Sequence, residues 1–206
     1  MRVAARKAMQ LSQLMSLTTA QRGDRPVSRA EESMLALLAI GAALVLASIW
    51  GIAAGSESAQ LAIANAYKVP MVILLSALTA LPAGLVALRL TNARLAAVEL
   101  ASAFATSIFG GTLVLATLAP LVAIYYHTSS KAGLPLALGS VFVALATASL
   151  LFARAVARRV EEKKSLLAVV VLVALFLAAL LQFVALAAPI IGTHGTVFDG
   201  GFDRVF

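Results

Sequence analysis

Hydrophobic and polar residues are segregated along this chain into five long apolar tracts joined by polar segments. The tracts contain no Asp, Glu, Lys or Arg and cover residues 33–56, 69–88, 100–130, 132–153 and 165–198. Each is at least as long as the ~20 residues that an α-helix needs to cross roughly 30 Å of hydrocarbon. We therefore predict an all-α fold, an integral membrane bundle of five transmembrane helices. The transmembrane domain covers residues 33–191, with spans near 33–54, 69–89, 99–126, 134–154 and 166–190.

The segments outside these spans carry weaker helical patterns. In the leader, residues 1–32, Ala4 and Ala8 share one helical face and Arg2 and Arg6 the other. This predicts a short amphipathic helix in the headgroup layer, with a frayed basic tail as the alternative.

The segment 55–68, between the first two spans, has the pattern of a short surface helix. Ser56 is its predicted cap, and Tyr67 and Lys68 are expected at the next membrane interface.

The composition of the chain excludes a water-soluble fold. The chain has 206 residues, of which 62% are hydrophobic and 12% charged. That leaves too little polar surface to cover five such helices in water.

Basic residues alternate between the two sides of the predicted bundle. Thirteen of the sixteen Lys and Arg residues lie in the leader, the second loop and the fourth loop. Because short loops rich in Lys and Arg stay in the cytoplasm, we predict a cytoplasmic N-terminus and an extracytoplasmic C-terminus. The net charge of +7 suits anionic lipid headgroups, so the lipid bilayer is a predicted partner and nucleic acid is not.

Small and hydroxylated residues recur at four-residue spacing inside the tracts. Transmembrane helices associate through such residues, because small side chains let backbones approach and polar ones bond across. The predicted helix-packing residues are Gly51, Gly55, Ser76, Ala80, Gly84, Ser102, Thr106, Gly110, Ala144, Ala148, Ala174, Ala178 and Gln182. They predict a compact bundle, and they leave contacts with other subunits or with a second copy open.

Two prolines interrupt the second and third spans. Pro82 and Pro120 each remove a helical hydrogen bond, and Thr79 and Thr117, three residues earlier, are expected to bond the exposed carbonyls. These kinks are interpreted as static features or as hinges of a transport path.

The sequence has few residues suited to catalysis or to metal binding. The chain has no Cys, no metalloprotease, hydrolase or phosphate-loop motif, and so no predicted enzymatic activity. Glu99 is expected as a solvated carboxylate near a helix start. His127 and His194 are weak metal or haem candidates, with an aromatic interface belt as the favoured interpretation around His127. We predict no catalytic residue, cofactor or metal.

The predicted extracytoplasmic tail, residues 192–206, is rich in aromatic side chains. Phe198, Phe202 and Phe206 recur every four residues. Large aromatic side chains are common anchors in interfaces, so these three are predicted partner contacts.

Three segments resemble a group of functionally uncharacterised bacterial multi-span proteins. They are KVPMVILLSALTALP from Lys68, LATLAPLVAIYYHTS at the end of the third span and LQFVALAAPIIG at the end of the fifth. The resemblance covers about two thirds of the chain and implies a bacterial inner membrane location. Where that group has Arg before the Pro of the last motif, this chain has Ala188. The five-span topology also resembles that of the Yip family of membrane-trafficking proteins, without its characteristic motifs.

Two functional hypotheses follow. The first is a non-enzymatic membrane subunit that anchors or scaffolds a larger membrane complex. The alternative is a small transporter or channel with a path between the kinked second and third spans, past Ser76, Thr79, Thr117 and Gln182.

Overall fold

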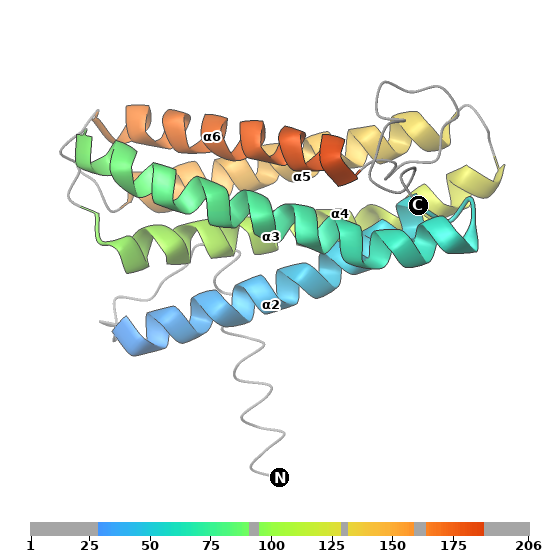
Figure 1. The fold of residues 1–206 in the computed structure, drawn as a ribbon, viewed down its shortest axis with the longest axis horizontal. Coiled ribbons are helices and arrows are strands. Elements are labelled where there is room, and N and C mark those ends of the chain that lie inside the picture. Colours follow the sequence, from blue (N-terminus) through green and yellow to red (C-terminus); the bar gives the residue numbers. More distant parts are fainter. Residues whose placement is uncertain (1–28, 91–94, 129–131, 159–163, 188–206) are drawn as a thin grey trace, which may run out of the picture.

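The chain folds as a bundle of long antiparallel and parallel helices. The structure, a computed structural model, describes residues 29–90, 95–128, 132–158 and 164–187, and the side chains of the last helix from Val169 onward. Its helices are α2 (Arg29–Ala54), α3 (Ala59–Leu90), α4 (Ala97–Thr128), α5 (Gly133–Ala157) and α6 (Lys164–Ala187). Successive helices run in opposite directions (Figure 1). We call the two ends of the bundle the α2–α3 end and the α3–α4 end, after the connections found there.

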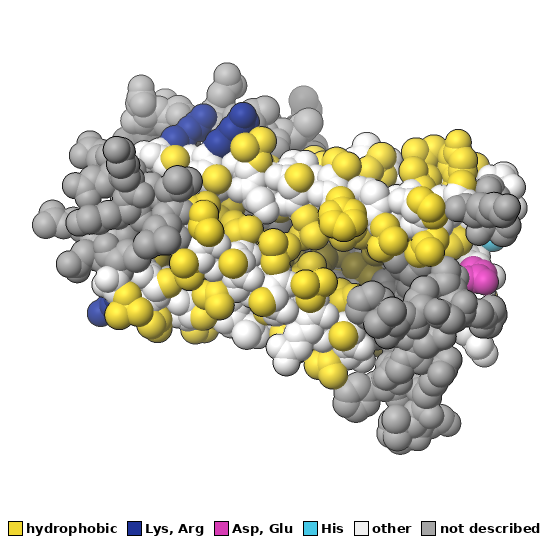
Figure 2. All heavy atoms as spheres, turned by 90° about the horizontal axis from the view of Figure 1, so that it is seen from above, with side chains coloured by type: hydrophobic (Ala, Val, Ile, Leu, Met, Phe, Trp, Pro, Cys, Tyr) yellow, Lys and Arg dark blue, Asp and Glu magenta, His cyan; other side chains and the backbone are white. Residues whose placement is uncertain are grey.

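All five helices are long and apolar enough to cross a membrane. The prediction of an all-α fold with five membrane-spanning helices is thereby confirmed. The predicted amphipathic leader helix and the aromatic tail lie outside the described residues. Hydrophobic side chains spread over the face shown in Figure 2, where Lys and Arg side chains lie toward the α3–α4 end.

Helix α3 differs from the prediction at its start. It begins at Ala59 and continues without a break through Pro70 and the second span, so the segment 55–68 is not a separate surface helix. The Ser58 hydroxyl, rather than Ser56, accepts a hydrogen bond from the Leu61 amide at 3.2 Å. At 1.5 Å per residue, its 32 residues extend over about 48 Å, well beyond the hydrocarbon thickness.

The order of helices in space differs from their order in the sequence. Helix α2 packs extensively on α4 and on α3, α4 packs on α5, and α3 packs on α6, whereas α3 and α4 barely touch. Helices α5 and α6 meet over only a short stretch. Helix α2 therefore packs against both α3 and α4, which have few direct contacts with each other.

Two apolar clusters form the core. The cluster toward the α3–α4 end takes buried residues from all five helices, including Phe104, Phe152 and Leu172. The cluster toward the α2–α3 end takes its buried residues from α2, α3, α4 and α5. Helix α6 thus contributes buried residues, Val169 and Leu172, to the first cluster and none to the second.

Candidate functional site

A ladder of small residues runs along the buried face of α2. Gly51 and Gly55, predicted from the sequence, are buried, and the ladder continues upstream at the same four-residue spacing through Ala39, Ala43 and Ala47, which are at most 1% exposed. Sequence reasoning missed these three alanines, although their spacing was the available signal. The ladder lets the backbones of neighbouring helices approach α2 closely.

Glycines in the ladder mark where α2 meets the beginning of α3. A Cβ atom at Gly51 would overlap the carbonyl oxygen of Asn65 and lie 3.1 Å from Val69 Cγ2. A Cβ atom at Gly55 would lie 2.7 Å from the carbonyl oxygen of Leu61. The first turns of α3, before the predicted second span, therefore pack directly against the backbone of α2.

The other predicted glycines lie at two further helix crossings. Gly84 of α3 faces Leu172 of α6 so closely that an added Cβ atom would overlap the leucine Cδ2 atom. An added Cβ atom at Gly110 of α4 would likewise overlap the Cδ1 atom of Leu151 in α5.

Gly111, next along α4, lies close to α5 at both predicted alanines. A Cβ atom there would lie 3.0 Å from the Ala144 carbonyl oxygen and 3.0 Å from the Ala148 Cβ atom.

The predicted hydroxyl positions in α3 and α4 bond within their own helices. Ser76 is fully buried and donates to the Val72 carbonyl at 2.6 Å. Thr106 donates to the carbonyl of Ser102 at 2.7 Å. Because these hydroxyls bond the preceding turn, Ser76 and Thr106 contribute packing rather than a bond across helices.

A hydrogen bond between two buried side chains joins α2 to α5. Trp50 Nε1 donates to Ser140 Oγ at 3.0 Å, and Ser140 Oγ donates to the Ala137 carbonyl at 2.7 Å. Both residues are only 3% exposed. The pair was not predicted; the chain's single tryptophan was its only sequence signal.

Two polar residues of α3 are buried near the α2–α3 end. Asn65 is fully buried and Lys68 is 7% exposed, although Lys68 was expected at the interface. The hydroxyl oxygens of Ser56 and Tyr126 are also buried in this part of the bundle, and neither has a hydrogen-bond partner among the described residues. Polar side chains here lie among tightly packed helices rather than around an open site.

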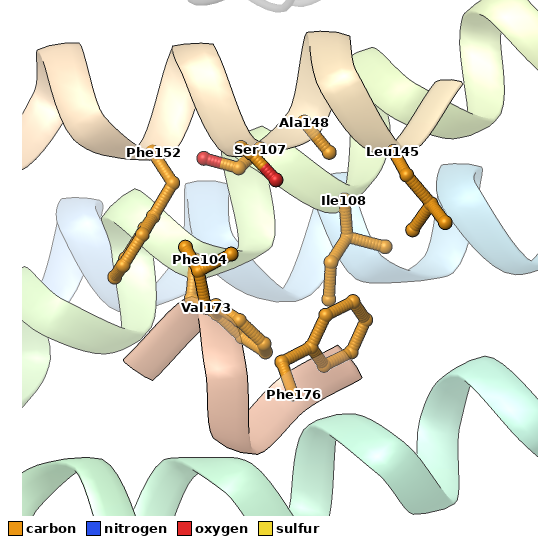
Figure 3. A pocket seen from close by; sticks show the side chains of 9 residues that line it. Phe104, Ser107, Ile108, Leu145, Ala148, Phe152, Val173 and Phe176 are labelled. Carbon is orange, nitrogen blue, oxygen red and sulfur yellow. The ribbon is translucent and has the colours of Figure 1, made fainter. Parts of the chain in front are cut away.

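The space between α4, α5 and α6 is lined mainly by apolar side chains (Figure 3). The Phe104 ring makes edge-to-face contacts with Phe152 and Phe176, at centroid distances of 5.7 Å and 5.0 Å. The cavity of about 20 Å³ has room for roughly one water molecule. It holds no ligand-sized space in this conformation.

A larger cavity of about 250 Å³ lies at the α3–α4 end, between the first turns of α2 and α4. Arg29, Glu32 and Glu99 line it with neighbouring backbone. Glu99 Oε2 accepts a hydrogen bond from the Ala96 amide at 3.0 Å. Glu99 therefore caps the start of α4, which gives this carboxylate a structural role.

The four residues of the predicted transport path do not line a common space. Ser76 is buried in the bundle, whereas Thr79, Thr117 and Gln182 are exposed. Thr79 donates to the Leu75 carbonyl at 2.9 Å, and Thr117 to that of Leu113.

Each of these threonine hydroxyls was expected to bond a carbonyl exposed by the following proline. Each instead reaches the carbonyl four residues back, because a threonine hydroxyl in a helix bonds that carbonyl readily.

The predicted residues of α6 lie away from the bundle. Ala174, Ala178 and Gln182 are exposed, while Val169, Leu172 and Ala179 of the same helix are buried. Helix α6 thus presents one face to the bundle and a second face, with two alanines and an amide, to its surroundings. We call Ala174, Ala178 and Gln182 the α6 outer face.

The remaining candidates are placed as follows. Ala80 and Ser102 are buried in the core, and His127 is exposed in the last turn of α4. Within the described residues, no three His, Asp or Glu side chains gather as a metal site would require. His194, Phe198, Phe202 and Phe206 lie outside the described residues.

Five apolar helices of spanning length, packed through glycine and alanine, define a multi-pass helical membrane protein. Comparisons with protein-family models, curated proteins and solved structures found no match to the chain. The resemblances to the bacterial multi-span group and to the Yip family therefore stay predictions.

Proposed function

We propose that this protein is a non-enzymatic membrane subunit that anchors or scaffolds a larger membrane complex. The observation that carries the proposal is the α6 outer face, on which an amide side chain and two alanines are exposed on a membrane-spanning helix. Burying a hydrogen-bonding group in hydrocarbon without a partner is costly, and amides at this depth commonly bond to neighbouring helices. The α6 outer face therefore has the chemistry of a helix-docking surface.

The interior of the bundle supports the same role. The helices meet so closely at Gly51, Gly84 and Gly110 that an added Cβ atom would overlap a neighbouring atom. That atom is a backbone oxygen at Gly51 and a leucine methyl group at the other two glycines. Helices in such close contact form a firm support from which an outer face can be presented to a partner.

We propose an orientation of the protein in the membrane from the charges at the two ends of the bundle. Arg29, Arg89, Arg154 and Arg158 lie at the α3–α4 end, and Lys68 lies toward the opposite end. This distribution supports an orientation with the α3–α4 end in the cytoplasm. The inner membrane of a bacterium is proposed from the resemblance to the bacterial multi-span group alone. The aromatic tail, with Phe198, Phe202 and Phe206, would then offer a second partner contact outside.

Purification and flux measurements test the proposal. The full-length protein is extracted in mild detergent, its stoichiometric partners are identified, and the purified protein alone is tested for solute flux in liposomes. The expected result is a defined complex, with other chains or with itself, and no flux. Flux by the isolated protein, or a lone monomer in every mild detergent, would overturn it.

A further inference from the structure

We draw no further inference here: the strongest candidate, the cavity of about 250 Å³ between the first turns of α2 and α4 at the α3–α4 end, rests on two carboxylates, Glu32 and Glu99, beside a helix N-terminus, and nothing in the described part of the chain shows which ligand would occupy it.

Discussion

The α-carbon of Gly51 in α2 lies directly against the carbonyl oxygen of Asn65 in α3, with no room between them for a Cβ atom. A backbone oxygen cannot turn aside as the tip of a flexible side chain can. This contact is therefore the least tolerant of the helix crossings in the bundle.

We expect Gly51→Ala to lower the free energy of unfolding by about 1–3 kcal/mol, the usual cost of forcing extra volume into a packed site. Gly41→Ala is the matched control, because nothing lies within 4 Å of a Cβ atom at that position of the same helix. The control should be neutral, or more stable by up to ~1 kcal/mol from helix propensity. Thermal unfolding in mild detergent measures both, and equal stabilities would contradict the contact.

The contact between Gly84 and Leu172 makes a different prediction, because it involves a side chain. Gly84→Ala should destabilise the α3–α6 crossing by about 1–3 kcal/mol, and Leu172→Ala by about 2–5 kcal/mol through the cavity it leaves. The double variant should lose less than the sum, since the new methyl group fills part of the space that Leu172 vacates. Gly139→Ala, where an added Cβ atom meets nothing within 4 Å, is the control. Strict additivity of the two changes would show that the residues do not touch.

The hydrogen bond between Trp50 and Ser140 can be followed through fluorescence, because Trp50 is the chain's single tryptophan. Ser140→Ala leaves the indole N–H without its acceptor in a buried site. We expect a loss of about 1–3 kcal/mol, the cost of a buried donor left unsatisfied, and a blue shift of the emission maximum. Thr147→Ala removes a half-exposed hydroxyl of the same helix and should leave the spectrum unchanged. An unaltered spectrum in Ser140→Ala would argue against the bond.

The orientation can be tested with single cysteines at the two ends of the bundle. Glu57 lies at the α2–α3 end and Ala157 at the α3–α4 end, and both are exposed. A membrane-impermeant maleimide should label Glu57→Cys in intact spheroplasts and Ala157→Cys only after the membrane is opened. The cysteine-free parent provides the background. The reverse pattern would place the basic end outside and remove the proposed orientation.

Local properties of the sequence predicted the spans well and their limits less well. Charge-free apolar tracts located all five helices, because hydropathy acts residue by residue. The start of α3 escaped prediction because Asn65 and Lys68 resemble loop residues until their burial against the bundle is known. Trp50 and Ser140 escaped for a related reason, since they are far apart in the sequence and nothing local links them.

By itself, the sequence determined that this protein crosses a membrane as five helices. A helix satisfies its own backbone hydrogen bonds, so an apolar segment of sufficient length can span the bilayer whatever its neighbours are. Only the tertiary structure decided which helices meet: α3 packs on α2 and α6 rather than on α4, and Gln182 lies on an outer face while Ser76 lies within. Lipid is as apolar as the helix surfaces, so hydrophobicity does not decide which helices pair. Pairing depends on how particular side chains fit together, such as Leu172 against Gly84. That fit cannot be predicted from hydropathy.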